Sequence, residues 1–175
     1  MSEKANPMSE PRITKVSVNI GVGEGGDRLV NAEWVLQLVT GIKPQGTLGR
    51  IQNGDVRVRL GAPIGCKATM RDKESIEKFL TDAFWVREKI IPKWNFDLSG
   101  NLSFGIRDYT DFPDQKYDPD IGIYGMDITI VLERPGHRVS RRRKGKAKVA
   151  MSHHVTADEA REWFKKNYDL TILED

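Results

Sequence analysis

The stretch from Arg12 to Gly26 (RITKVSVNIGVGEGG) constrains the fold more than any other part of this chain. Apolar residues occupy alternate positions from Val16 to Val22, polar residues or glycine stand between them, and a glycine-rich segment follows directly. Such alternation is typical of a strand that buries one face and leaves the other open. We therefore expect a half-buried strand that ends in a turn over Gly23–Gly26.

Other segments repeat the same alternation or show helical spacing. Alternation predicts strands at 64–70, 102–106 and 126–132, and a hairpin or extended loop over 45–61. Helical spacing predicts one helix from Asp27 to the glycine at 41, and a second from Asp72 whose end, between 85 and Pro92, stays open. A last helix opens with a capping box at Thr156 and Glu159. This order, without regular βαβ alternation, favours an α+β fold with an antiparallel sheet.

The chain has 175 residues, the size of one domain. We expect a flexible lead over 1–11 and a single domain over 12–175 that includes a basic arm at 134–150. No apolar run is long enough to span a membrane, and the N-terminus lacks the apolar core of a secretory signal. The single cysteine, Cys66, fits a reducing compartment. These features favour the cytoplasm.

The positive charge is concentrated in one segment. Eight of the 28 basic residues, and none of the 25 acidic ones, lie between Arg134 and Lys148, so the rest of the chain is slightly acidic. Clustered Lys and Arg gain affinity for nucleic acid by releasing its counterions. The arm therefore indicates a nucleic-acid partner, with a solvated charged loop as the alternative.

The glycines that follow the first strand allow a second interpretation. Gly21, Gly23 and Gly26 satisfy G-x-G-x-x-G between a strand and a helix, as in dinucleotide-binding enzymes. The first strand of such a fold is buried on both faces, whereas this one alternates. The acidic residue expected about 20 residues later is also missing. A tight turn that needs positive φ explains one or two of the glycines without any ligand.

Neither a metal nor a cofactor is expected. His153 and His154 are adjacent, so they do not easily share one metal, and with His137 and one cysteine they are interpreted as surface histidines. The aspartates between 108 and 120 lack the spacing of a calcium loop and are expected to shape turns. The open strand faces, which include Ser17, supply donors for RNA but no aromatic side chains, which favours recognition of shape and backbone.

Five longer motifs carry a resemblance to a known family. They are NPMSEPRITKVSVNIGVGEGGDRLVNA, LVTGIKP, APIGCKATMRD, GNLSFGI and KYDPDIGIYGMDITIVLERPG, and they follow one another over residues 6–170. With these motifs the chain resembles the universal large-subunit ribosomal protein family that binds 5S ribosomal RNA, numbered fifth in bacteria and eleventh in eukaryotes. KYDPDIGIYGMD and the basic arm resemble its archaeal and eukaryotic branch.

The resemblance implies a non-enzymatic structural protein with a curved antiparallel sheet and helices on one face. It implies binding to 5S rRNA in the central protuberance, beside another 5S-binding ribosomal protein, and contact with the large rRNA. It also implies contact with peptidyl tRNA through the loop 46–61, although GTLGRIQNGD holds one arginine where relatives often carry several basic residues.

The candidate site residues come from this resemblance and from the basic arm. The rRNA-binding candidates are Arg12, Lys15, Asn19, Gly21, Lys43, Gln45, Lys67, Thr69, Arg71, Arg138, Arg141, Arg142 and Arg143. The family motif that contains Lys43 and Gln45 also maps to Thr40, Gly41 and Pro44. The tRNA-contacting candidates are Arg50, Arg57 and Arg59.

Overall fold

The computed structural model describes residues 6–52, 54, 58–113 and 115–173. The chain divides into two compact units. We call Val16–Glu88 together with Phe104–Thr129 the sheet unit, and Met1–Lys15, Lys89–Ser103 and Ile130–Asp175 the arm unit. Three of the strands have residues in both units.

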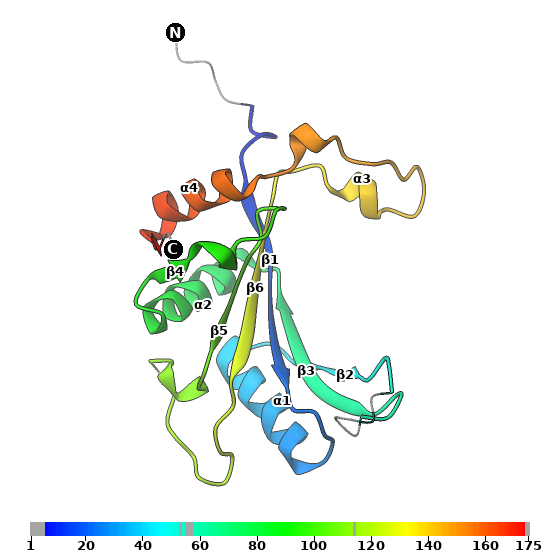
Figure 1. The fold of residues 1–175 in the computed structure, drawn as a ribbon, viewed down its shortest axis with the longest axis vertical. Coiled ribbons are helices and arrows are strands. Elements are labelled where there is room, and N and C mark those ends of the chain that lie inside the picture. Colours follow the sequence, from blue (N-terminus) through cyan, green and yellow to red (C-terminus); the bar gives the residue numbers. More distant parts are fainter. Residues whose placement is uncertain (1–5, 53, 55–57, 114, 174–175) are drawn as a thin grey trace. The chain divides into compact units, whose positions relative to one another are not determined.

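One sheet holds five strands in the order β2-β3-β1-β6-β5 (Figure 1). The strands are β1 (Arg12–Gly21), β2 (Gln45–Leu48), β3 (Pro63–Met70), β5 (Leu102–Ile106) and β6 (Met126–Glu133). β3 runs antiparallel to both β1 and β2, which confirms the α+β prediction with an antiparallel sheet. The alternation in β1 is also confirmed, because Val16, Val18 and Ile20 are at most 1% exposed whereas Asn19 is exposed.

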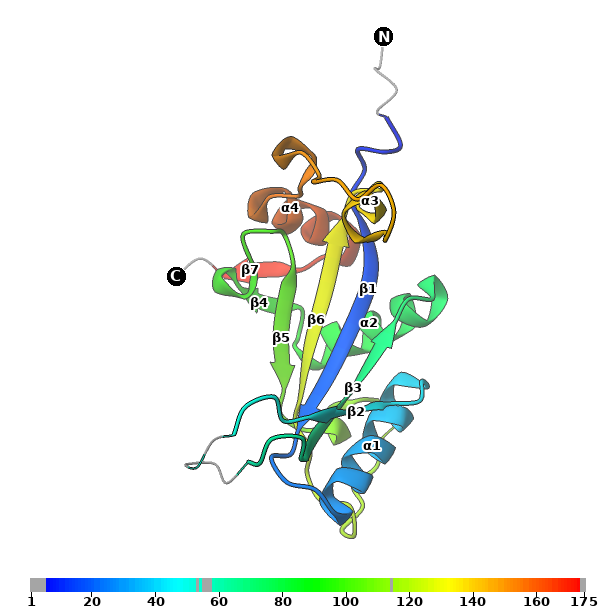
Figure 2. The same cartoon turned by 90° about the vertical axis from the view of Figure 1, so that its right-hand side faces the viewer.

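Two helices pack in the sheet unit (Figure 2). α1 (Asp27–Thr40) packs against β3 and ends at Gly41, whose positive φ of 68° is the left-handed cap that glycine favours. α2 (Lys73–Val86) begins after Asp72, whose carboxylate accepts a hydrogen bond from the Ser75 amide at 3.1 Å. Both helices bury apolar side chains, which leaves the opposite face of the sheet open.

The second helix ends earlier than proline alone would require. α2 stops at Val86, and the two residues Glu88 and Lys89 adopt positive φ values of 54° and 58°. Two successive left-handed residues end an α-helix and reverse the chain. The segment beyond them becomes β4 (Ile90–Pro92), so Pro92 lies in a strand.

The arm unit contains a second, parallel pair of strands that the sequence pattern does not predict. β4 pairs with β7 (Thr171–Leu173) through three residues on each side. Between the arm and β7 lies α4 (Ala157–Tyr168), and its predicted capping box is confirmed, since Thr156 and Glu159 bond each other's backbone amides. The Phe164 ring of α4 packs edge-on against Phe96 at 6.0 Å.

Four short helices complete the described elements. They are the 3-10 helices η1 (Lys93–Asn95), η2 (Tyr109–Asp111) and η3 (Met151–His153), and the single-turn α3 (Arg138–Arg141). In the described part of the chain, no helix combines the length and the apolar character that a bilayer crossing needs.

The pairing of two glycines at the end of β1 and β3 gives a test of the sheet. Gly21 and Gly65 are cross-strand partners, but a Cβ at Gly65 would lie 2.6 Å from the Ile20 carbonyl oxygen, whereas a Cβ at Gly21 would meet nothing within 4 Å. Gly65→Ala should therefore lower the free energy of unfolding by about 1–3 kcal/mol, as overpacking does. Urea denaturation of Gly65→Ala and of the control Gly21→Ala measures this difference. Equal stabilities would contradict the close approach of the strands.

Candidate RNA-binding interface

Three strands of the sheet unit place candidate residues in one row. Lys67 on β3 is the cross-strand partner of Asn19 on β1 and of Gln45 on β2. Residues paired in this way point to the same face of a sheet. All three side chains are exposed. The structure therefore brings together a cation and two amides, which donate and accept hydrogen bonds, on the open face.

The neighbouring rows extend this polar face in both directions. Thr69 pairs with Ser17 on one side of the row, and Gly65 pairs with both Gly21 and Thr47 on the other. Open space lies where a Gly21 side chain would stand, so a ligand has room to approach this part of the β1 backbone closely. We call the exposed side of these rows the polar face.

A hollow adjoins the polar face at the edge strand β2. Its volume is about 370 Å³, and Gln45, Leu48, Arg50, Leu60 and Lys67 line it. Leu48 and Leu60 are 60% and 69% exposed, so apolar groups as well as cations face solvent along this edge. Arg50 and Arg59 are exposed, whereas Arg57 lies outside the described residues.

The other predicted positions of the sheet unit divide into exposed and structural residues. Lys43 and Arg71 are exposed beside β2 and β3. Thr40, which the family motif also marks, is buried: its hydroxyl donates to the Leu36 carbonyl at 2.6 Å and accepts from the Ile42 amide at 3.3 Å. Thr40 therefore stabilises the end of α1 and does not face a ligand.

In the arm unit, the basic arm is a folded loop. The Ala147 amide donates to the Val139 carbonyl at 3.2 Å, and Arg142 Nε donates to the Gly145 carbonyl at 2.7 Å. These bonds return the chain on itself after α3. Arg12, another predicted contact of this unit, is exposed, and Lys15 is half-buried.

Not every cation of the arm is available for a ligand. Arg141 forms an ion pair with Glu133, and Arg134 is held by protein groups. In contrast, five cations of the arm form neither an ion pair nor a side-chain hydrogen bond within the described ranges, and they are Arg138, Arg143, Lys144, Lys146 and Lys148. All five side chains are exposed.

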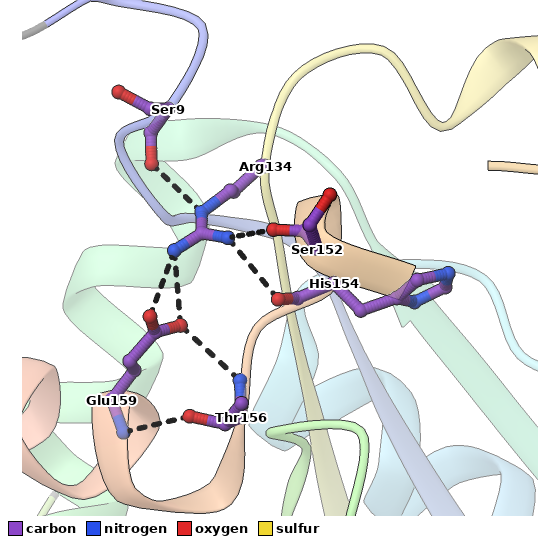
Figure 3. A network of polar contacts seen from close by, with 6 residues as sticks. All are labelled: Ser9, Arg134, Ser152, His154, Thr156 and Glu159. Carbon is purple, nitrogen blue, oxygen red and sulfur yellow. Dashed lines mark hydrogen bonds and ion pairs between the residues drawn. The ribbon is translucent and has the colours of Figure 1, made fainter. Parts of the chain in front are cut away.

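Arg134 connects three segments at the base of the arm (Figure 3). Its guanidinium donates to the carbonyl oxygens of Ser9, Ser152 and His154 at 2.9–3.2 Å, and to both carboxylate oxygens of Glu159 at 3.0 Å. Glu159 also belongs to the capping box of α4. Arg134 therefore ties the lead, the segment after η3 and the start of α4 together. Sequence spacing does not reveal this role, because the partners lie 18–125 residues away along the chain.

The three histidines, which the sequence analysis interprets as surface residues, lie together at the base of the arm. The His137 ring lies 5.9 Å from that of His153 and 5.0 Å from that of His154, and all three residues are half-buried. His153 Nε2 is 2.7 Å from the Pro135 carbonyl oxygen. In the residues that the structure describes, no group of three or more His, Cys, Asp or Glu is arranged to hold a metal ion.

The acidic loop between β5 and β6 is shaped by its own side chains, as the sequence predicts. Asp108 accepts a hydrogen bond from the Thr110 amide, and Asp118 accepts one from the Asp120 amide, both at 3.0 Å. These contacts form turns.

The dinucleotide interpretation is not compatible with the fold around Gly21. β1 pairs with β3 in antiparallel fashion, whereas that site needs parallel strands on each side of a crossover. Gly23 and Gly26 adopt positive φ values of 84° and 101°, as a tight turn into α1 requires.

Cys66 is buried. Burial and, to a smaller extent, the charge of Glu33 raise the pKa of its thiol to about 11, so it is a poor nucleophile at neutral pH.

Comparisons with known proteins agree with this architecture. The model of the ribosomal protein L5 family matches residues 6–52, and the model of the C-terminus of the same ribosomal family matches residues 63–163. The large ribosomal subunit protein uL5 of Thermoplasma acidophilum is 47% identical over 96% of this chain and 99% of its own length. The uL5 protein of Sulfurisphaera tokodaii is 45% identical over 99% of this chain and 98% of its own.

These matches place the chain among the structural, non-enzymatic proteins of the large ribosomal subunit, a class whose partner is ribosomal RNA. The chain belongs to the ribosomal protein L5 family. This assignment confirms the predicted family and the predicted location in the ribosome.

The Arg134 network predicts a specific loss of stability. Arg134→Lys keeps the charge, but an ammonium group cannot reproduce the planar fork that reaches Glu159 and three carbonyls at once. We expect a decrease of about 1–3 kcal/mol in the free energy of unfolding and faster hydrogen exchange in the first turn of α4. Arg143→Lys, at an exposed arm position without an ion pair in the described ranges, is the matched control. Equal exchange rates in the two variants would refute the network's role.

Proposed function

We propose that this chain binds 5S rRNA in the central protuberance, beside another 5S-binding ribosomal protein, and also contacts the large rRNA. The observation that carries the proposal is the row of Asn19, Lys67 and Gln45 on the open side of the sheet. A cation placed between two amides suits a phosphate with neighbouring ribose hydroxyls or base edges.

The chemistry of the two sheet faces supports RNA as the partner of the polar face. The opposite face is filled by apolar side chains of the strands and helices, among them Val18, Cys66 and Phe104, which are at most 5% exposed. Aromatic platforms are absent from the rows of the polar face in the described part of the chain. Binding therefore depends on backbone and shape more than on base stacking.

The folded arm supports a second, electrostatic part of the interface. The five cations that form neither an ion pair nor a side-chain hydrogen bond in the described ranges lie within eleven residues, and the hydrogen bonds inside the arm reduce the entropy that a disordered tail would lose on binding. Such a cluster of cations attracts a nucleic acid whatever the nucleotide sequence.

The loop 46–61 is proposed to contact peptidyl tRNA. Arg50 and Arg59 would supply charge, and the exposed Leu48, Ile51 and Leu60 would supply apolar contact. Because the segment GTLGRIQNGD of this loop holds one arginine, the contact should depend weakly on salt.

Substitutions on the polar face test the leading proposal. Lys67→Ala should weaken binding to 5S rRNA and reduce the salt slope of the affinity by about 1, as loss of one phosphate contact does. Asn19→Ala should weaken binding by about 1–3 kcal/mol with an unchanged slope, because an uncharged contact is lost. Affinity measurements over a salt series separate the two effects. Lys78→Ala, at an exposed lysine of α2, is the control for charge.

Two outcomes would contradict the proposal. One is a wild-type affinity for 5S rRNA no better than for tRNA of similar length. The other is a Lys78→Ala variant that loses as much affinity as Lys67→Ala, since the effect would then come from net charge alone.

The arm is tested by neutralising only its unpaired cations. Replacement of Arg138, Arg143, Lys144, Lys146 and Lys148 by Gln should lower the salt slope by up to about 4 and leave preference for 5S rRNA over tRNA in place. Glutamine substitutions of exposed lysines on α2 and α4 (Lys73, Lys78, Lys165 and Lys166) serve as the comparison. An unchanged slope in the arm variant would refute its electrostatic role.

A further inference from the structure

A pocket at the base of the arm is not explained by the polar face or by the unpaired cations of the arm. It lies within the arm unit and has a volume of about 350 Å³, at the lower end of the range of roughly 300–1,000 Å³ for small-ligand pockets. Polar and charged residues from four segments line it, and they include Lys15, Asn101, Glu133, His137, Arg141 and His154.

The charges around this pocket favour an anion. Glu133, the acidic residue of the lining, is paired with Arg141. Lys15 of β1 forms no ion pair within the described ranges. Arg134 contacts a residue of the lining, since its guanidinium donates to the carbonyl oxygen of His154 at 3.1 Å. The lining thus keeps at least one uncompensated cation when both histidines are neutral.

The histidines of the pocket change its charge near neutral pH. In the protein without a ligand, burial lowers the pKa of His137, and the charges of His154, His153 and Arg141 lower it further, against the opposing effect of Glu133. His137 Nε2 is also buried and has no hydrogen-bond partner among the described residues. A bound anion would oppose these effects, since it compensates the charge of an imidazolium and accepts its N–H.

We propose that this pocket holds a phosphate group of the RNA backbone, and that its occupation is coupled to proton uptake by His137 and His154. The inference rests on the proposed RNA-binding function. A backbone phosphodiester keeps one negative charge throughout the neutral range, so the pH dependence originates in the protein. Protonation adds up to two cations and two donors to the pocket. The affinity for RNA therefore rises as the pH falls through the histidine range.

The test is the affinity of the full chain for 5S rRNA at pH 8 and pH 6, at constant ionic strength. The wild type is expected to bind about five- to twentyfold more tightly at pH 6, because binding is coupled to proton uptake. His137→Gln combined with His154→Gln should abolish this difference. His153→Gln is the matched control, because His153 does not line the pocket and should retain it.

Histidine titrations by NMR provide a readout that does not depend on the variants. RNA should raise the pKa of His137 relative to the free protein, in which burial lowers it. An unchanged pKa with RNA would overturn the inference, as would a pKa increase with inorganic phosphate but not with RNA, since the pocket would then serve the free ion.

Failure of this inference is distinct from failure of the proposed function. Tight, selective binding to 5S rRNA at pH 8 with no pH dependence refutes only the proton coupling. Absence of selective binding at either pH refutes the proposed function itself.

Discussion

The antiparallel register between β1 and β3 is the constraint on which the rest of the sheet unit depends. Side chains alternate along both strands, so a slip of one residue would turn Val16 and Val18 outward and Asn19 inward. The burial of that apolar set therefore determines which residues remain outside. Gly65 maintains the register at its end, because only a residue without Cβ fits against the Ile20 carbonyl. Core and polar face are consequences of one hydrogen-bond pattern.

The parts of the fold that are predictable from the sequence are those with local, repeated signals. The long strands, α1 and α4 follow from periodicity, a cap glycine at 41 and the capping box at Thr156. The pairing of β4 with β7 is not predictable in this way, since three-residue strands contain no period and their partners are 81 residues apart. The end of α2 depends on left-handed residues at Glu88 and Lys89, for which neither side chain is a usual choice.

The candidate site, too, contains residues that local sequence signals predict and residues whose roles depend on distant contacts. Alternation predicts that Asn19 and Lys67 are exposed on one face, and the register then makes them neighbours. Residue type alone misassigns Arg134, which counts as a cation of the arm but binds protein carbonyls and Glu159. Residue type also does not predict that His137 and His154 are neighbours, because their rings meet only where the arm folds back to its base. Such roles are set by tertiary contacts between distant segments.

The arm unit is built from three separate stretches of the chain, and this affects how the protein folds during translation. The sheet unit is complete once Thr129 has been synthesised, whereas the arm unit joins residues near the N-terminus to β7. Ser9 meets Arg134 only after 125 further residues have been added. During translation, therefore, the sheet can fold while the lead and β4 still await their partners. The base of the arm is assembled last, so a nascent chain acquires the polar face first and the folded arm afterwards.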